Sequence, residues 1–86
     1  MKAKLVFTKK AQKELGRLDA QTRKRIAIKL QYYLEQEKPL EHARPLVHSS
    51  LGSFRFRVGH YRIAFDKEGS KYVVVSVIHR KNAYKK

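Results

Sequence analysis

Residues 54–65, FRFRVGHYRIAF, carry the pattern that decides the fold. Side chains alternate in character on both sides of a central Gly-His pair, with arginine at three of the alternate positions. Because successive side chains of a strand point to opposite faces of a sheet, this alternation predicts two antiparallel strands joined by a tight turn. One face of the pair then joins the core, and the opposite, open face carries Arg55, Arg57 and Arg62.

Strand and helix signals on either side of this hairpin indicate an α+β fold. Residues 2–7 alternate as a strand with one buried side, and residues 71–78 have the apolar run of a central strand. Thr8 and Asp19 are suited to cap two helices, and Pro39 is expected to end the second one. That second helix contains an apolar stripe at helical spacing, formed by Ile26, Leu30, Tyr33 and Leu34.

The order of elements is therefore β-α-α-β-β-β, a small antiparallel-dominated sheet with an N-terminal helical hairpin packed on one face. With 86 residues, we expect a single domain over residues 1–86. The absence of cysteine excludes disulfides and thiolate metal sites, and the sequence has no carboxylate cluster for magnesium, so we expect neither a metal nor a cofactor. No apolar run reaches the roughly 18 residues of a membrane helix, so we expect a cytoplasmic protein with no membrane partner.

The charge is strongly basic, with 21 Lys and Arg against seven Asp and Glu and a formal net charge of +14. Such an excess favours a polyanionic partner, nucleic acid first, with an acidic protein as the alternative. Three arginines beside one turn favour phosphate binding over ordinary solvated strand charges, because a planar guanidinium matches the oxygens of a phosphate.

The end of the last predicted strand adds His79, Arg80 and Tyr84. These residue types suit metal-free cleavage of RNA, whose 2′-hydroxyl is a built-in nucleophile. Arginine can stabilise the charge that develops on the phosphate, histidine can transfer protons near neutral pH, and tyrosine can stack on a base or donate a proton. The residues alone leave catalysis and plain RNA binding equally open.

The stretches LGSFRFRVGHYRIAF (51–65) and VVVSVIHRKNAY (73–84) resemble the RelE branch of the RelE/ParE toxin superfamily. Its pattern has a Leu-x-Gly element, an R-x-R-x-G strand and turn, a G-x-YR step and a terminal H-R-x-x-x-Y. The resemblance implies a type II toxin, an endoribonuclease (mRNA interferase) that cuts mRNA in the ribosomal A site by 2′-hydroxyl attack and so inhibits translation. It also implies a cognate antitoxin, expected to be acidic and RelB-like, with operator DNA contacted only through that antitoxin.

By position, the resemblance implies that Arg62 and Arg80 stabilise the phosphate and that Tyr84 stacks on the target nucleotide or assists proton transfer. Arg55 and Arg57 stand where some members have lysine, and Arg44 stands where some have glutamate. Since arginine effectively cannot lose its proton, these changes leave His79 or Tyr84 as the proton-transfer group. The remaining basic candidates are expected to bind RNA phosphates: Arg44, Arg55, Arg57 and Lys81.

Three further histidines have no predicted catalytic role. His60 stands where the family commonly has aspartate and is expected only to shape the turn, and His42 and His48 are expected to be surface loop residues. Three other functions remain open: a ParE-like poison of DNA gyrase, a non-catalytic RNA-binding domain, and a degenerate toxin kept for antitoxin binding. The HRKNAY ending (79–84) argues against the first, and the lack of aromatic residues on the arginine side argues against the second.

Overall fold

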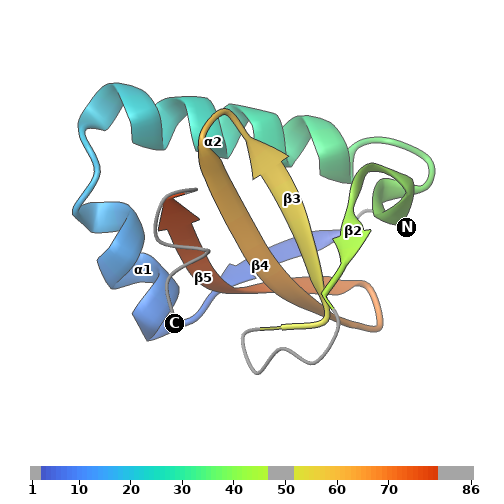
Figure 1. The fold of residues 1–86 in the computed structure, drawn as a ribbon. Helices are drawn as coiled ribbons and strands as arrows, with labels where there is room; N and C mark the ends of the chain where they lie inside the picture. Colours follow the sequence, from blue (N-terminus) through green and yellow to red (C-terminus); the bar gives the residue numbers. More distant parts are fainter. Residues whose placement is uncertain (1–2, 47–51, 80–86) are drawn as a thin grey trace.

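The central hairpin forms as the alternation predicts, as strands β3 (Phe54–Val58) and β4 (Tyr61–Glu68). The computed structural model describes residues 3–46 and 52–79. It adds β1 (Lys4–Phe7), α1 (Lys9–Gly16), α2 (Ala20–Leu34), the short 3-10 helix η1 (Pro39–His42), β2 (Arg44–Pro45) and β5 (Lys71–His79). Figure 1 shows these elements as one five-stranded sheet in the order β1-β5-β4-β3-β2, in which β1 runs parallel to β5 and the other pairs are antiparallel. The predicted α+β class is confirmed, and β2 is an additional strand.

Both helices begin at the predicted caps. The Ala11 N–H donates to Thr8 Oγ1 at 3.1 Å, and the Thr22 N–H donates to Asp19 Oδ2 at 3.2 Å. Hydrogen bonds from the hydroxyl and the N–H of Thr22 lower the pKa of Asp19. The expected end of α2 was wrong, because the helix stops at Leu34 and Pro39 instead opens η1. Proline has the backbone angle of a first helical residue, so it starts this short helix more readily than it ends the long one.

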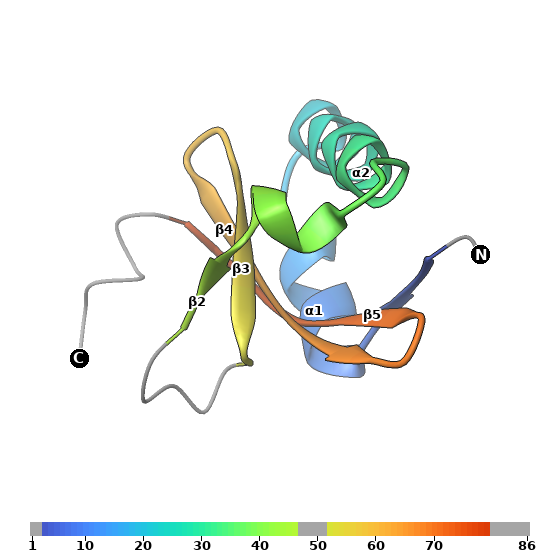
Figure 2. The same cartoon turned by 90° about the vertical axis from the view of Figure 1, so that its right-hand side faces the viewer.

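The two helices cover one face of the sheet (Figure 2). Helix α1 packs against β5 and β1, while α2 packs against β3. The core between the layers contains the side chains of Ile26, Leu30, Phe56, Ile63 and Phe65, each at most 1% exposed. This burial places the odd-numbered side of β4 and the even-numbered side of β3 toward the helices, as the alternation predicts.

On the edge of β5 away from β4, α1 takes the place of a neighbouring strand beyond the part that pairs with β1. Val75 is an extra residue in β5, since Ala64 pairs with Ser76 and the next residue of β4 pairs with Val74. Beyond this bulge the Glu14 carboxylate accepts a hydrogen bond from the Val77 N–H at 2.9 Å and one from the Ser76 hydroxyl at 3.0 Å. A side chain of α1 therefore completes the edge of β5 just before the end that carries His79.

Candidate functional site

Four arginines lie on one face of the sheet, the face opposite the helices. Arg57 is the direct partner of Arg62 across β3 and β4, and Arg44 is the direct partner of Arg55 across β2 and β3. Directly paired residues of antiparallel strands share a face, and so do residues two apart in one strand. We call this set the arginine face: Arg44, Arg55, Arg57 and Arg62. Sequence reasoning placed the last three on a common face, and the register agrees.

The arginine face brings like charges into register. Arg44 and Arg57 are exposed, and Arg55 and Arg62 are partly buried. Like charges directly opposite each other in a sheet are destabilising. A polyanion lying across the three strands would offset that repulsion and could be held by guanidinium forks. The arrangement can therefore bind phosphate groups.

Asp66 lies on the same face of the sheet as the four arginines, toward the far end of β4. Its Oδ1 atom accepts hydrogen bonds from the N–H and the hydroxyl of Ser53, each at 2.8 Å. The preceding residue, Gly52, has a φ of 128° and lies against the backbone of Phe65. These contacts hold the segment that leads into β3 and so help to position Arg55 and Arg57.

The turn between β3 and β4 lies beside the end of β5. The His60 ring is 6.2 Å from the His79 ring, with an angle of 27° between the planes, and the His79 ring meets the Tyr61 ring edge-on at 5.0 Å. His60 also lines a pocket of about 130 Å³ together with Arg57 and Arg62. His79 is the direct partner of Tyr61, so it lies on the helix side of the sheet rather than on the arginine face.

Sequence reasoning missed the position of His60 next to His79. The signal was present, because an antiparallel β4 and β5 bring the turn before β4 to the end of β5. It was assigned only a turn-shaping role. The other C-terminal candidates, Arg80, Lys81 and Tyr84, lie outside the described residues, as does His48. His42 is exposed in η1, and its ring stacks on Tyr33 at 5.5 Å.

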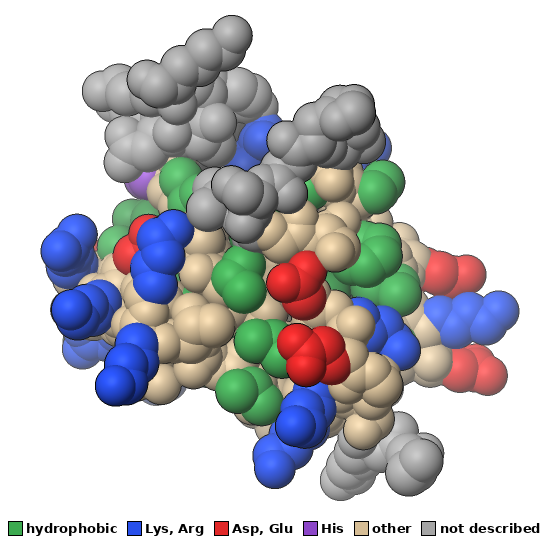
Figure 3. Space-filling model, turned by 90° about the horizontal axis from the view of Figure 1, so that it is seen from below, with side chains coloured by type: hydrophobic (Ala, Val, Ile, Leu, Met, Phe, Trp, Pro, Cys, Tyr) green, Lys and Arg blue, Asp and Glu red, His purple; other side chains and the backbone are tan. Residues whose placement is uncertain are grey.

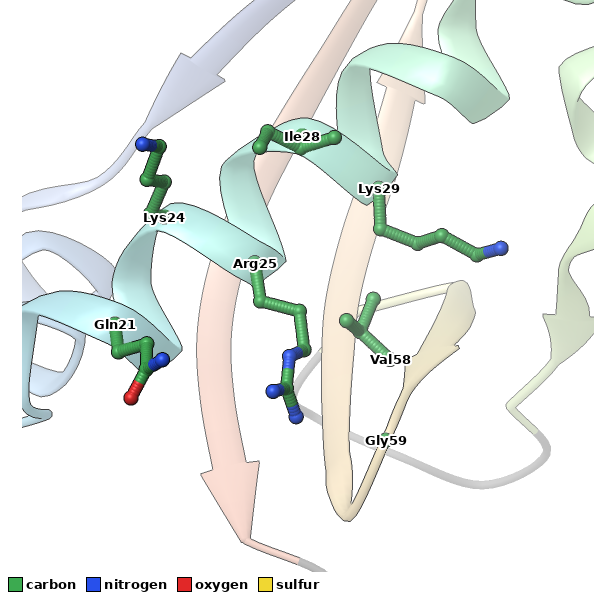
Figure 4. Close-up of a pocket in the computed structure, with 7 residues that line it drawn as sticks. All are labelled: Gln21, Lys24, Arg25, Ile28, Lys29, Val58 and Gly59. Atoms are coloured by element: carbon green, nitrogen blue, oxygen red, sulfur yellow. The ribbon is translucent and has the colours of Figure 1, made fainter.

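A basic groove lies between α2 and the β3–β4 turn. It has a volume of about 500 Å³ and is lined by Lys24, Arg25 and Lys29, with Ile28 and Val58 as apolar lining. Ile28 is 60% exposed, and Arg25 extends from α2 toward the hairpin (Figure 4). None of the described residues that line the groove is acidic. Its chemistry suits an anionic partner with some apolar surface.

Two solved structures that are similar to this chain are toxin–antitoxin complexes. A chain of the toxin–antitoxin complex RelBE2 from Mycobacterium tuberculosis is 26% identical, with a TM-score of 0.71 over 93% of this chain and 100% of that chain. A chain of the RelB-RelE antitoxin–toxin complex from Methanococcus jannaschii is 25% identical, with a TM-score of 0.69 over 92% and 94% of the two chains. No curated protein sequence is significantly similar.

The fold and the comparisons thus define a toxin of the RelE/ParE type. Residues 5–84 match the family described as the ParE toxin of the type II toxin–antitoxin system parDE, and the chain belongs to that family. The resemblance to the RelE/ParE superfamily is confirmed. The sequence family carries the ParE name while the two structures carry the RelE name, so these comparisons leave the molecular target open. In the described ranges, the helices are all too short or too polar to cross a membrane.

Proposed function

We propose that this toxin is a ribosome-dependent mRNA endonuclease that cuts A-site mRNA and inhibits translation. The supporting observation is that arginines and histidines lie together at one end of the sheet. Arg57 and Arg62 line a pocket with His60, and the His60 ring lies 6.2 Å from that of His79. Cations that can hold a phosphate therefore adjoin groups that can move protons.

The proposed reaction uses the RNA's own 2′-hydroxyl as the nucleophile. The 2′-oxygen attacks the adjacent phosphorus, and the bond from phosphorus to the 5′-oxygen breaks. Arg62, with Arg80, offsets the negative charge that grows on the phosphate oxygens. His79 or Tyr84 transfers a proton, and Arg44, Arg55, Arg57 and Lys81 bind neighbouring phosphates.

Its proposed partners are the ribosome with its mRNA and an acidic, RelB-like antitoxin, with operator DNA reached only through the antitoxin. The groove lined by Lys24, Arg25 and Lys29 adjoins the β3–β4 turn, so the basic surface continues from α2 to the hairpin. An acidic antitoxin that covers this end would compete with ribosomal RNA for the same cations, which would account for neutralisation. Ribosome binding places the site of action in the cytoplasm.

We also propose that residues 1–86 form one toxin domain, since β1 pairs with β5 and so ties the two ends of the chain into one sheet.

A second candidate function is poisoning of DNA gyrase. The match to the ParE toxin family over residues 5–84 favours it. The arginine face could then bind DNA phosphates without any proton transfer, and the two histidines would have no catalytic role. Mapping of RNA ends separates the two functions.

The decisive experiment is to induce the toxin in a bacterium and map mRNA 5′ ends, comparing wild type with Arg62→Ala. We expect growth arrest with codon-phased cuts for wild type and a loss of cutting of about 10²-fold or more for the variant, as on removal of a group that stabilises transition-state charge. Arg17→Ala is the matched control, because Arg17 is exposed at the end of α1. Arrest without cuts would indicate gyrase instead, and normal cutting by Arg62→Ala would show that the site is misplaced.

A further inference from the structure

We infer that His60 is a second catalytic histidine and that His60 and His79 act as an acid–base pair in RNA cleavage. The inference rests on the proposed endonuclease function and assigns the two proton transfers that the reaction requires. It departs from the sequence-based expectation that His60 only shapes the turn.

The turn itself does not depend on the His60 side chain. Gly59 has a φ of 58° and takes the left-handed position that a tight two-residue hairpin needs. His60 is exposed at the tip, where many residue types would serve as well for folding. The fold therefore does not require a histidine at position 60, and the His60 side chain is free to take part in a reaction.

The spacing of the two rings fits a single phosphodiester. The centroids of the His60 and His79 rings are 6.2 Å apart, and the ring planes make an angle of 27°. Proton transfer requires a ring nitrogen within about 2.6–3.2 Å of the reacting oxygen. Two rings at this separation can each approach a different oxygen of one phosphodiester, the 2′-oxygen and the 5′-oxygen.

The surroundings of the pair supply charge and orientation. Arg57 from β3 and Arg62 from β4 share the pocket with His60, Tyr61 holds the His79 ring edge-on, and Arg25 extends from α2 toward the turn. Arg57 and Arg62 lie on the opposite face of the sheet from His79, and His60 at the turn adjoins both. A phosphodiester bound at the turn, between the two faces, would have its non-bridging oxygens held by Arg57 and Arg62 while the two rings act on its bridging oxygens.

The two histidines together account for both proton transfers of the reaction. One neutral imidazole takes the proton from the 2′-hydroxyl as the 2′-oxygen-to-phosphorus bond forms. The other, protonated imidazole gives its proton to the 5′-oxygen as the phosphorus-to-oxygen bond breaks. The products are a 2′,3′-cyclic phosphate and a 5′-hydroxyl, and exchange with water restores the two rings.

The test is single-turnover cleavage of a defined mRNA on purified ribosomes, measured from about pH 5 to about pH 8, where histidine titrates. Wild type should give a bell-shaped profile, because one ring must be neutral and the other protonated. His60→Ala should lose one limb of the bell and cut about 10²-fold or more slowly. Added imidazole should restore part of the rate, and the limb that is lost identifies which ring is the base.

His42→Ala is the matched control, since it removes an exposed histidine whose ring contacts Tyr33, and its rate and profile should stay those of wild type. His60→Gln, with thermal unfolding of each variant, separates lost chemistry from lost folding. A folded His60→Ala or His60→Gln that cuts at the wild-type rate overturns the inference while the endonuclease function stands. A His60 variant that cuts more slowly, keeps both limbs of the pH profile and is not accelerated by added imidazole also overturns the inference. A wild-type protein that leaves ribosome-bound mRNA intact overturns the proposed function itself, before any variant is measured.

Discussion

At the scale of single residues, Gly52 shows how closely the segment before β3 approaches the sheet. Its φ of 128° is open only to glycine in practice, and a Cβ there would lie 3.0 Å from the carbonyl oxygen of Phe65 and 3.1 Å from Val75 Cγ2. Gly52→Ala should lower the free energy of unfolding by roughly 1–3 kcal/mol, measured by urea denaturation. Gly16→Ala is the control, because a Cβ at Gly16 meets nothing within 4 Å. Equal midpoints for the two variants would contradict this account.

Glu14 has a structural role that its place on a surface helix does not reveal. Its Oε1 atom accepts hydrogen bonds from the Val77 N–H and from the hydroxyl of Ser76, a side chain that is 0% exposed. Glu14→Ala would leave both donors unpaired and should cost about 1–3 kcal/mol for each buried donor. Glu14→Gln removes the same charge but keeps an acceptor, so it should cost much less.

The comparison of the two Glu14 variants by chemical denaturation isolates the acceptor from the charge. The ion pair of Glu14 with Lys10, at 3.9 Å, lies at the surface and contributes little. If Glu14→Gln were as destabilising as Glu14→Ala, the charge rather than the acceptor would hold β5 to α1.

At the scale of elements, the sequence predicted those features that depend on local chemistry. Alternation defined β3 and β4, and the side chains of Thr8 and Asp19 marked the starts of both helices. The paired strand β2, only two residues long, depends on contact with β3, which no local signal in the connector reveals. The bulge at Val75 is likewise unmarked in the sequence, where residues 71–78 read as one continuous strand.

The candidate site also has a part that the sequence predicted and a part that only the structure revealed. A period of two was enough to place Arg55, Arg57 and Arg62 on a common face. The approach of His60 to His79 required the register of β4 against β5, which shifts at the bulge. The antiparallel order of β4 and β5 was enough to bring the turn near the end of β5, but the approach of the two rings required the register. The roles assigned to all of these residues remain predictions.

At the scale of the whole molecule, the charge is unevenly distributed. The end formed by α2 and the hairpin turn carries Lys24, Arg25 and Lys29 beside Arg57 and Arg62. Acidic side chains gather where α2 ends and η1 begins, at Glu35, Glu37 and Glu41. Figure 3 shows the molecule from below, the side away from the β3–β4 turn: basic side chains gather toward the left, where α1 lies, and most acidic ones lie toward the middle and the other side. The hairpin end is thus one strongly basic part of a molecule whose net charge is +14, and we expect a polyanion to bind there.

This asymmetry predicts a position-dependent effect of removing charge. A Lys24→Gln, Arg25→Gln double variant should bind ribosomes more weakly and lower the slope of log affinity against log salt by about 2, since each phosphate contact contributes about one unit. The matched control is the double variant Lys38→Gln, Lys67→Gln, which removes the same amount of charge. These two lysines line another pocket, together with Glu37 and Glu41. If net charge alone drives binding, both double variants will weaken it equally in salt titrations. If the hairpin end carries the contacts, only the first double variant will change the slope.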